Sequence, residues 1–168
     1  MPINNNLSLD NELINGLQMD AIDLLKSLLA IPSFSKEEDK TAAILIDFLA
    51  ARQIKTERLI NNIWATNLHF DSNKPSLLLN SHHDTVKPNK GYTIDPFDPF
   101  EAEGKLYGLG SNDAGGCLVS LLATFLYFYD KENLPYNIFL LPPRKKKFRG
   151  MMALNWFYPN CQKLNLEL

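Results

Sequence analysis

Cysteine is scarce in this sequence: Cys117 and Cys161 are the two among 168 residues. They form no disulfide framework, so we expect a reducing compartment. No apolar run reaches transmembrane length, and no signal-peptide pattern opens the chain. The net charge of −2 provides no global attraction to nucleic acid or to an anionic membrane. We therefore expect a cytoplasmic protein with neither a nucleic-acid nor a membrane partner.

The hydrophobic fraction of 45% and the charged fraction of 21% are ordinary for a globular domain. Helix-like and strand-like segments alternate, which predicts an α/β fold with part of a mainly parallel sheet flanked by helices. Residues 1–18 are polar and Asn-rich, and we expect a flexible arm there. A capping box of Ser35 and Glu38 is expected to start the second helix. Helices are predicted over 20–34, 35–54 and 114–132, and strands over 55–60, 62–70, 76–81, 105–113 and 136–141.

Two of the three histidines stand side by side in "SHHDTV", directly after the apolar run Leu77–Leu79. Three consecutive leucines suit a strand that is covered on both faces. Alternation along the strand sends His82 and Asp84 to one side and His83 to the other. His82 could then bind a metal while Asp84 fixes its ring tautomer. The alternative is a solvated strand end with no metal.

A second carboxylate, Asp113, lies between glycines in "YGLGSNDAGG", where a helix is about to begin. Glycines permit tight backbone turns and the close approach of another group. Asp113 is therefore a candidate metal ligand. The alternative is an aspartate that interacts favourably with the helix dipole at an N-terminus.

Taken together, "IPSFSKEE", "SHHDTV" and "GLGSNDAGG" resemble the zinc-dependent M20 peptidase and deacylase family in order and spacing over residues 20–137. The resemblance is closest to the acetylornithine deacetylase and succinyl-diaminopimelate desuccinylase group. It implies that residues 19–139 form the N-terminal part of a zinc-peptidase-like catalytic domain, truncated relative to the family.

The resemblance also implies roles for individual residues. His82 would be a ligand of one zinc ion, Asp113 would bridge two zinc ions, and Asp84 would be a catalytic-site residue that orients His82 without ligating. Two Zn²⁺ ions are implied for a full-length site, with cobalt as a possible substitute. The family often has a lysine two positions after the bridging aspartate, but this chain has Gly115. That departure puts the substrate contacts in doubt and leaves the metal site unaffected.

The activity implied is a metal-dependent amide hydrolase that removes the acyl group from an N-acyl amino acid. An acetylornithine or acetylcitrulline deacetylase of arginine biosynthesis is the first expectation. An M20-type dipeptidase and a non-catalytic fragment are the alternatives. The partner implied is a small N-acyl amino acid, and a full-length relative is expected to be a homodimer.

The family's Glu-Glu pair, a general base and a ligand, is absent from residues 140–168, where the composition becomes basic and irregular. The run "PPRKKKFR" has ordinary explanations as a solvated basic face or a nuclear-import patch. Read one base out of frame, however, the codons permit a Glu-Glu-Glu run, and Met151-Met152 then forces an aspartate. We therefore expect a frameshift near residue 138, an out-of-frame tail over 140–168 and an inactive chain. A diverged tail and an engineered end are the alternatives.

Overall fold

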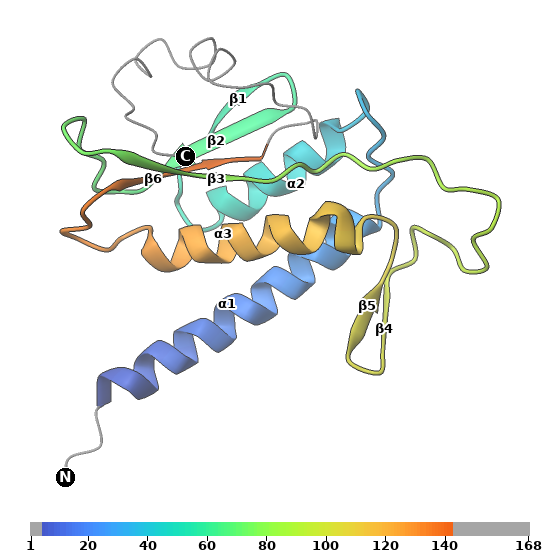
Figure 1. The fold of residues 1–168 in the computed structure, drawn as a ribbon, viewed down its shortest axis with the longest axis horizontal. Helices are drawn as coiled ribbons and strands as arrows, with labels where there is room; N and C mark the ends of the chain where they lie inside the picture. Colours follow the sequence, from blue (N-terminus) through green and yellow to red (C-terminus); the bar gives the residue numbers. More distant parts are fainter. Residues whose placement is uncertain (1–4, 143–168) are drawn as a thin grey trace.

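The structure is a computed structural model, and it describes residues 5–142 (Figure 1). Three helices, a main sheet and a small hairpin make up this part of the chain. The helices are α1 (Asn5–Leu29), α2 (Asp39–Ala50) and α3 (Gly116–Phe128), with a short helical turn at Ser111–Gly115 before α3. The strands are β1 (Glu57–Leu59), β2 (Asn62–Thr66), β3 (Ser76–Asn80), β4 (Phe100–Ala102), β5 (Lys105–Tyr107) and β6 (Asn137–Leu141).

The main sheet has the strand order β1-β2-β6-β3. Strands β3 and β6 are parallel, with Leu78 opposite Phe139, whereas β1–β2 and β2–β6 are antiparallel. The α/β class is therefore confirmed, but the sheet is mixed and not mainly parallel. A two-residue connection joins β1 to β2, and a connection that short can only return the chain antiparallel.

Alternating side chains of the sheet divide between two apolar clusters. Ile63, Ala65, Leu79, Ile138 and Leu140 belong to the main core together with buried leucines of the helices. Trp64, Phe139 and Leu141 form the second cluster. In Figure 1 α2 and α3 lie along the sheet, and α1 packs on α3 and extends away from it.

Buried residues run through all of β6 but not through β3. All five residues of β6 are buried, whereas Leu77 of β3 is 45% exposed. The expectation that the leucine run is covered on both faces is therefore wrong for β3. The reason is its place: β3 lies at the end of the strand order, while β6 has a hydrogen-bonded neighbour on each side.

Helix α1 is longer than expected because residues 5–18, predicted as a flexible arm, are helical. Its second half carries the buried residues Leu24, Leu25, Leu28 and Leu29. Once that half is packed, each added residue contributes one helical hydrogen bond without a new nucleation cost. The helix ends before Pro32, as predicted. No helix within residues 5–142 is long and apolar enough to cross a bilayer.

The predicted boundary between the catalytic region and the tail falls inside a strand. Leu140 and Leu141 belong to β6, where they pair with Leu79 and Asn80 of β3. Residues 143–168 lie outside the described residues, and they contain all of the expected out-of-frame tail except residues 140–142.

Candidate metal centre

The turn that follows β3 brings His82 and Asp84 together on one side, as the alternation predicted. The ring Nδ1 of His82 lies 3.0 Å from Oδ1 of Asp84 and 3.1 Å from its backbone carbonyl oxygen. The hydrogen bond goes to the carbonyl oxygen, and the carboxylate oxygen Oδ1 faces the same nitrogen as a close electrostatic neighbour. Both neighbours are acceptors, so Nδ1 is the nitrogen that carries the proton.

That tautomer leaves a lone pair on Nε2 of His82. Nε2 is buried and has no hydrogen-bond partner among the described residues. A buried ring nitrogen is ordinarily hydrogen-bonded or bound to a metal. His82 therefore has the tautomer that a metal ligand needs, with an Nε2 lone pair that no hydrogen bond occupies.

Asp113 is the carboxylate nearest to that nitrogen. Its Oδ1 lies 3.5 Å from Nε2 of His82, and its side chain is 68% exposed. Two ligand atoms at about 2.1 Å from one ion, at a tetrahedral angle, are roughly 3.4 Å apart, so this spacing fits a shared ion. Within residues 5–142 no group of three or more His, Cys, Asp and Glu side chains gathers around one point. The described residues thus bring two candidate ligands together.

Close backbone packing holds the Asp113 turn against the His82 loop. A Cβ on Gly110, whose φ is +90°, would lie 2.7 Å from Cγ2 of Thr85. A Cβ on Gly115 would lie 2.8 Å from the carbonyl oxygen of Gly110 and 2.6 Å from Cδ1 of Leu25. The turn therefore has no room for a side chain at position 115, which accounts for a glycine where the family often has a lysine.

His83 points the other way, into a buried polar pocket. Its Nε2 is 2.9 Å from the carbonyl oxygen of Asn61, and its Nδ1 is 2.9 Å from Oγ1 of Thr41. Burial lowers the pKa of His83, although the Asn61 carbonyl and the charge of Glu38 act in the opposite direction. His83 is therefore a neutral ring whose two hydrogen bonds anchor the loop on the side opposite His82.

The predicted capping box of Ser35 and Glu38 is wrong, and both side chains bond elsewhere. Helix α2 begins at Asp39 and has no side-chain cap bond. Glu38 is fully buried, and its carboxylate accepts hydrogen bonds from the Lys36 amide at 2.6 Å and from Nδ2 of Asn61 at 3.0 Å. Ser35 donates to Oδ2 of Asp84 at 2.7 Å. Partners across the fold, Asp84 for Ser35 and Asn61 for Glu38, thus replace the expected capping bonds.

Sequence reasoning missed Asn61 and Thr41 because they carry no local signal. Asn61 is 22 positions from His83 and Thr41 is 42 positions away. Both are 2% exposed or less. Asn61 precedes an apolar strand and would be taken for a turn residue, whereas Thr41 lies in the first turn of α2. Only the fold shows that both are buried against an imidazole.

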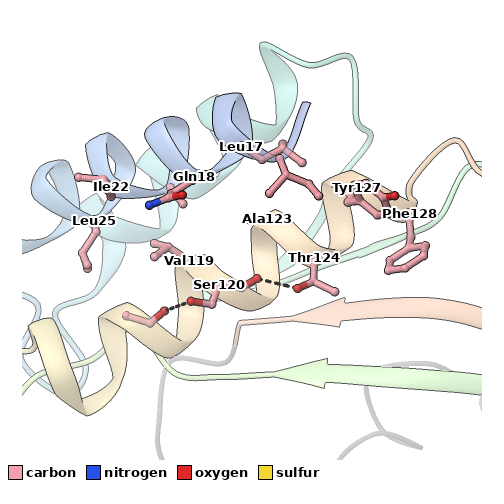
Figure 2. Close-up of a pocket in the computed structure, with 13 residues that line it drawn as sticks. Leu17, Gln18, Ile22, Leu25, Val119, Ser120, Ala123, Thr124, Tyr127 and Phe128 are labelled. Atoms are coloured by element: carbon pink, nitrogen blue, oxygen red, sulfur yellow. Dashed lines mark hydrogen bonds between the residues drawn. The ribbon is translucent and has the colours of Figure 1, made fainter. Parts of the chain in front are cut away.

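An apolar groove of the described residues contains none of the candidate ligands, although it reaches Leu25 and Gly116 close to the Asp113 turn. It lies between α1 and α3, has a volume of about 540 Å³ and is lined by residues such as Leu17, Ile22, Val119 and Tyr127 (Figure 2). No His, Cys, Asp or Glu lines it. The cavity that includes His82 and Asp84 is small, at about 20 Å³. We place the candidate site at the smaller cavity because His82 and Asp84 line it, with Asp113 in the adjoining turn.

Another hollow, of about 640 Å³, reaches the glycine-rich turn that carries Asp113. It is lined by the loop 89–96, by β5 and by Ser111. The loop leads away from the His82 turn and returns through β4 and β5 to the Asp113 turn (Figure 1). The hollow therefore adjoins the candidate centre at Ser111, and none of His82, Asp84 and Asp113 lines it.

The sequence model of peptidase family M20/M25/M40 matches residues 78–141, the stretch that contains His82, Asp84 and Asp113. Residues 78–141 are an M20-family region. The M20 region includes the end of β3, the whole candidate centre and β6. The resemblance inferred from the three motifs is thus confirmed.

Curated relatives agree with this assignment. A succinyl-diaminopimelate desuccinylase from Xanthomonas oryzae is 35% identical over 109 residues, covering 61% of this chain and 28% of that protein. One from Rickettsia felis is 32% identical over 162 residues, covering 88% of this chain and 42% of that protein. The chain thus spans less than half the length of these relatives.

Solved structures show the same fold. Human carnosine dipeptidase 1 superposes with a TM-score of 0.62 at 21% identity, covering 88% of this chain and 36% of that one. An M20 family metallo-carboxypeptidase from Sulfolobus solfataricus gives a TM-score of 0.57 at 24% identity, covering 73% of this chain and 30% of that one. The described residues therefore have the architecture of part of an M20 catalytic domain.

Proposed function

We propose that this chain supplies the first part of a dinuclear metal centre in an M20 amide hydrolase. His82 would hold one ion through Nε2, and Asp113 would be the ligand that both ions share. The observation that carries the proposal is the buried, unpartnered Nε2 of His82, which lies 3.5 Å from Oδ1 of Asp113. Residues 19–139 are then the N-terminal part of the catalytic domain.

When bound, a pair of Zn²⁺ or Co²⁺ ions polarises an amide carbonyl and lowers the pKa of bound water toward neutrality. The chain's own residues prepare the site for this. Asp84 keeps the proton of His82 on Nδ1, so that Nε2 remains a donor. His83 and the residues around it hold the loop from the opposite side. The general base must come from outside the described residues.

For the substrate we propose an N-acylated amino acid, and an N-succinyl group in first place. The support is that the curated relatives are succinyl-diaminopimelate desuccinylases. The acetylornithine or acetylcitrulline deacetylase expectation, with its place in arginine biosynthesis, becomes the second candidate. A dipeptidase remains the alternative. A cytoplasmic location and a homodimeric full-length relative stay part of the proposal.

Metal binding tests the centre directly. Zn²⁺ titrated into the metal-free 168-residue chain should shift the ring resonances of His82, and His82→Ala should abolish binding. Asp113→Asn should weaken binding at least tenfold, because a neutral amide replaces a charged ligand. His69→Ala is the matched control, since His69 is the remaining histidine and is exposed. Equal zinc affinity in wild type and His82→Ala would refute the site.

We further propose that the 168-residue chain is inert by itself, because the Glu-Glu pair of the family is not encoded in its frame. With Zn²⁺ or Co²⁺ present, it should hydrolyse neither N-succinyl-diaminopimelate nor N-acetylornithine. Turnover that His82→Ala removes would contradict this. Reading the DNA over codons 136–146 tests the frameshift independently.

A further inference from the structure

A short segment before α2 lies alongside the His82 loop. Phe34 and Thr85 form a parallel β-bridge. The amide of Thr85 donates to the carbonyl oxygen of Ser33 at 2.8 Å, and the hydroxyls of these two residues are 3.3 Å apart. These contacts fix the backbone of residues 33–35 relative to the backbone that carries Asp84.

Ser35 uses this position to hold the carboxylate. Its Oγ donates to Oδ2 of Asp84 at 2.7 Å, although the two residues are 49 positions apart. The other oxygen, Oδ1, is then turned toward Nδ1 of His82 at 3.0 Å. The terminal torsion of an aspartate has a broad energy minimum, so a carboxylate without such a bond would sample other orientations.

We propose that Ser35 is a positioning residue for the metal ligand His82 and that it acts through Asp84. The inference rests on the proposed function, because positioning His82 matters for binding only if His82 is a metal ligand. The bond has no helix-capping role, since α2 begins at Asp39 without a side-chain cap. Ser35 is exposed, so the loss of its hydroxyl removes no core packing.

Two readouts follow, and the first needs no metal. In the metal-free chain the Nδ1 proton of His82 should be protected from solvent, because a carbonyl and a carboxylate oxygen both face it. In Ser35→Ala this proton should exchange several times faster, as measured by NMR saturation transfer. The second readout is zinc affinity. The zinc Kd should rise by a factor of about 3 to 10, less than the loss typical for removing a ligand's direct partner.

Ser35→Thr keeps the hydroxyl and should restore both readouts. Ser27→Ala is the matched control, because Ser27 also donates one exposed hydrogen bond, to the carbonyl of Asp23 within α1. An Nδ1 proton that exchanges equally fast in wild type and in Ser35→Ala would overturn the proposal. Faster exchange in Ser35→Ala, with no zinc binding by any variant, would show that Ser35 holds Asp84 against His82, but it would overturn the metal centre and with it the proposed role in metal binding.

Discussion

The ring Nε2 of His83 and the carbonyl oxygen of Asn61 are 2.9 Å apart and tie the loop after β3 to the start of β2. A carbonyl oxygen only accepts, so Nε2 of His83 carries the proton. The bond is buried, as His83 is 6% and Asn61 2% exposed. The candidate centre therefore rests on a histidine that faces away from it.

His83 should make stability depend on pH. Burial lowers its pKa below the ordinary value of 6.5, so the unfolded chain takes up a proton that the folded chain does not. The free energy of unfolding should therefore fall as the pH drops below about 6.5 and level off below the folded-state pKa. Urea unfolding of the chelator-treated chain between about pH 8 and about pH 5 measures this. His83→Gln should show a shallower slope, and an identical slope would contradict the prediction.

Gly115→Ala should destabilise the fold by about 1–3 kcal/mol, because the new Cβ would overpack the turn. That Cβ would lie 2.8 Å from the backbone oxygen of Gly110, which cannot move aside like a flexible side chain. Gly16→Ala is the control, and it should change stability in the opposite direction. Nothing lies within 4 Å of a Cβ at this helical position, so the substitution should raise the free energy of unfolding by about 0.5–1 kcal/mol. Thermal unfolding of both variants separates the two effects, and a stabilised Gly115→Ala chain would contradict the packing argument.

Asn137→Ala should cost about 2–4 kcal/mol, since it removes the hydrogen bonds that a buried side-chain amide makes to part-buried backbone groups. The side chain of Asn137 donates to the carbonyls of Asp71 and Lys74 at 2.8 and 3.2 Å, and accepts from the Asp71 amide at 2.8 Å. These bonds set the turn that leads into β3. Asn73→Ala removes an exposed asparagine of the same turn and should cost much less. Chemical denaturation gives both values, and equal losses would show that burial is not the cause.

Much of the local structure could be predicted from the sequence. The helices containing Leu28 and Leu122 follow from apolar periodicity, and the strands around Ile63 and Ile138 follow from their apolar runs. The proximity of His82 and Asp84 follows from strand alternation. These features depend on residues only a few positions apart, so spacing alone can indicate them.

Long-range pairing could not be predicted in the same way. The sequence places Ser35 and Glu38 at capping-box spacing, but Asp84 and Asn61 offer them better partners across the fold. Which strand lies at the edge is likewise a global property. The burial expected for Leu77 is found instead along β6, because the order of strands is decided by how the whole core packs.

The place of β6 between β2 and β3 has a consequence for synthesis on the ribosome. Ala65 pairs with Leu140 and Ser76 pairs with Asn137, so neither β2 nor β3 can complete its pairing until the last described strand has emerged. Pairings so distant in sequence form slowly, because a long loop must close first. Until then the nascent chain carries two apolar strands without their shared neighbour. A chaperone that binds extended apolar segments would have its longest opportunity in this interval.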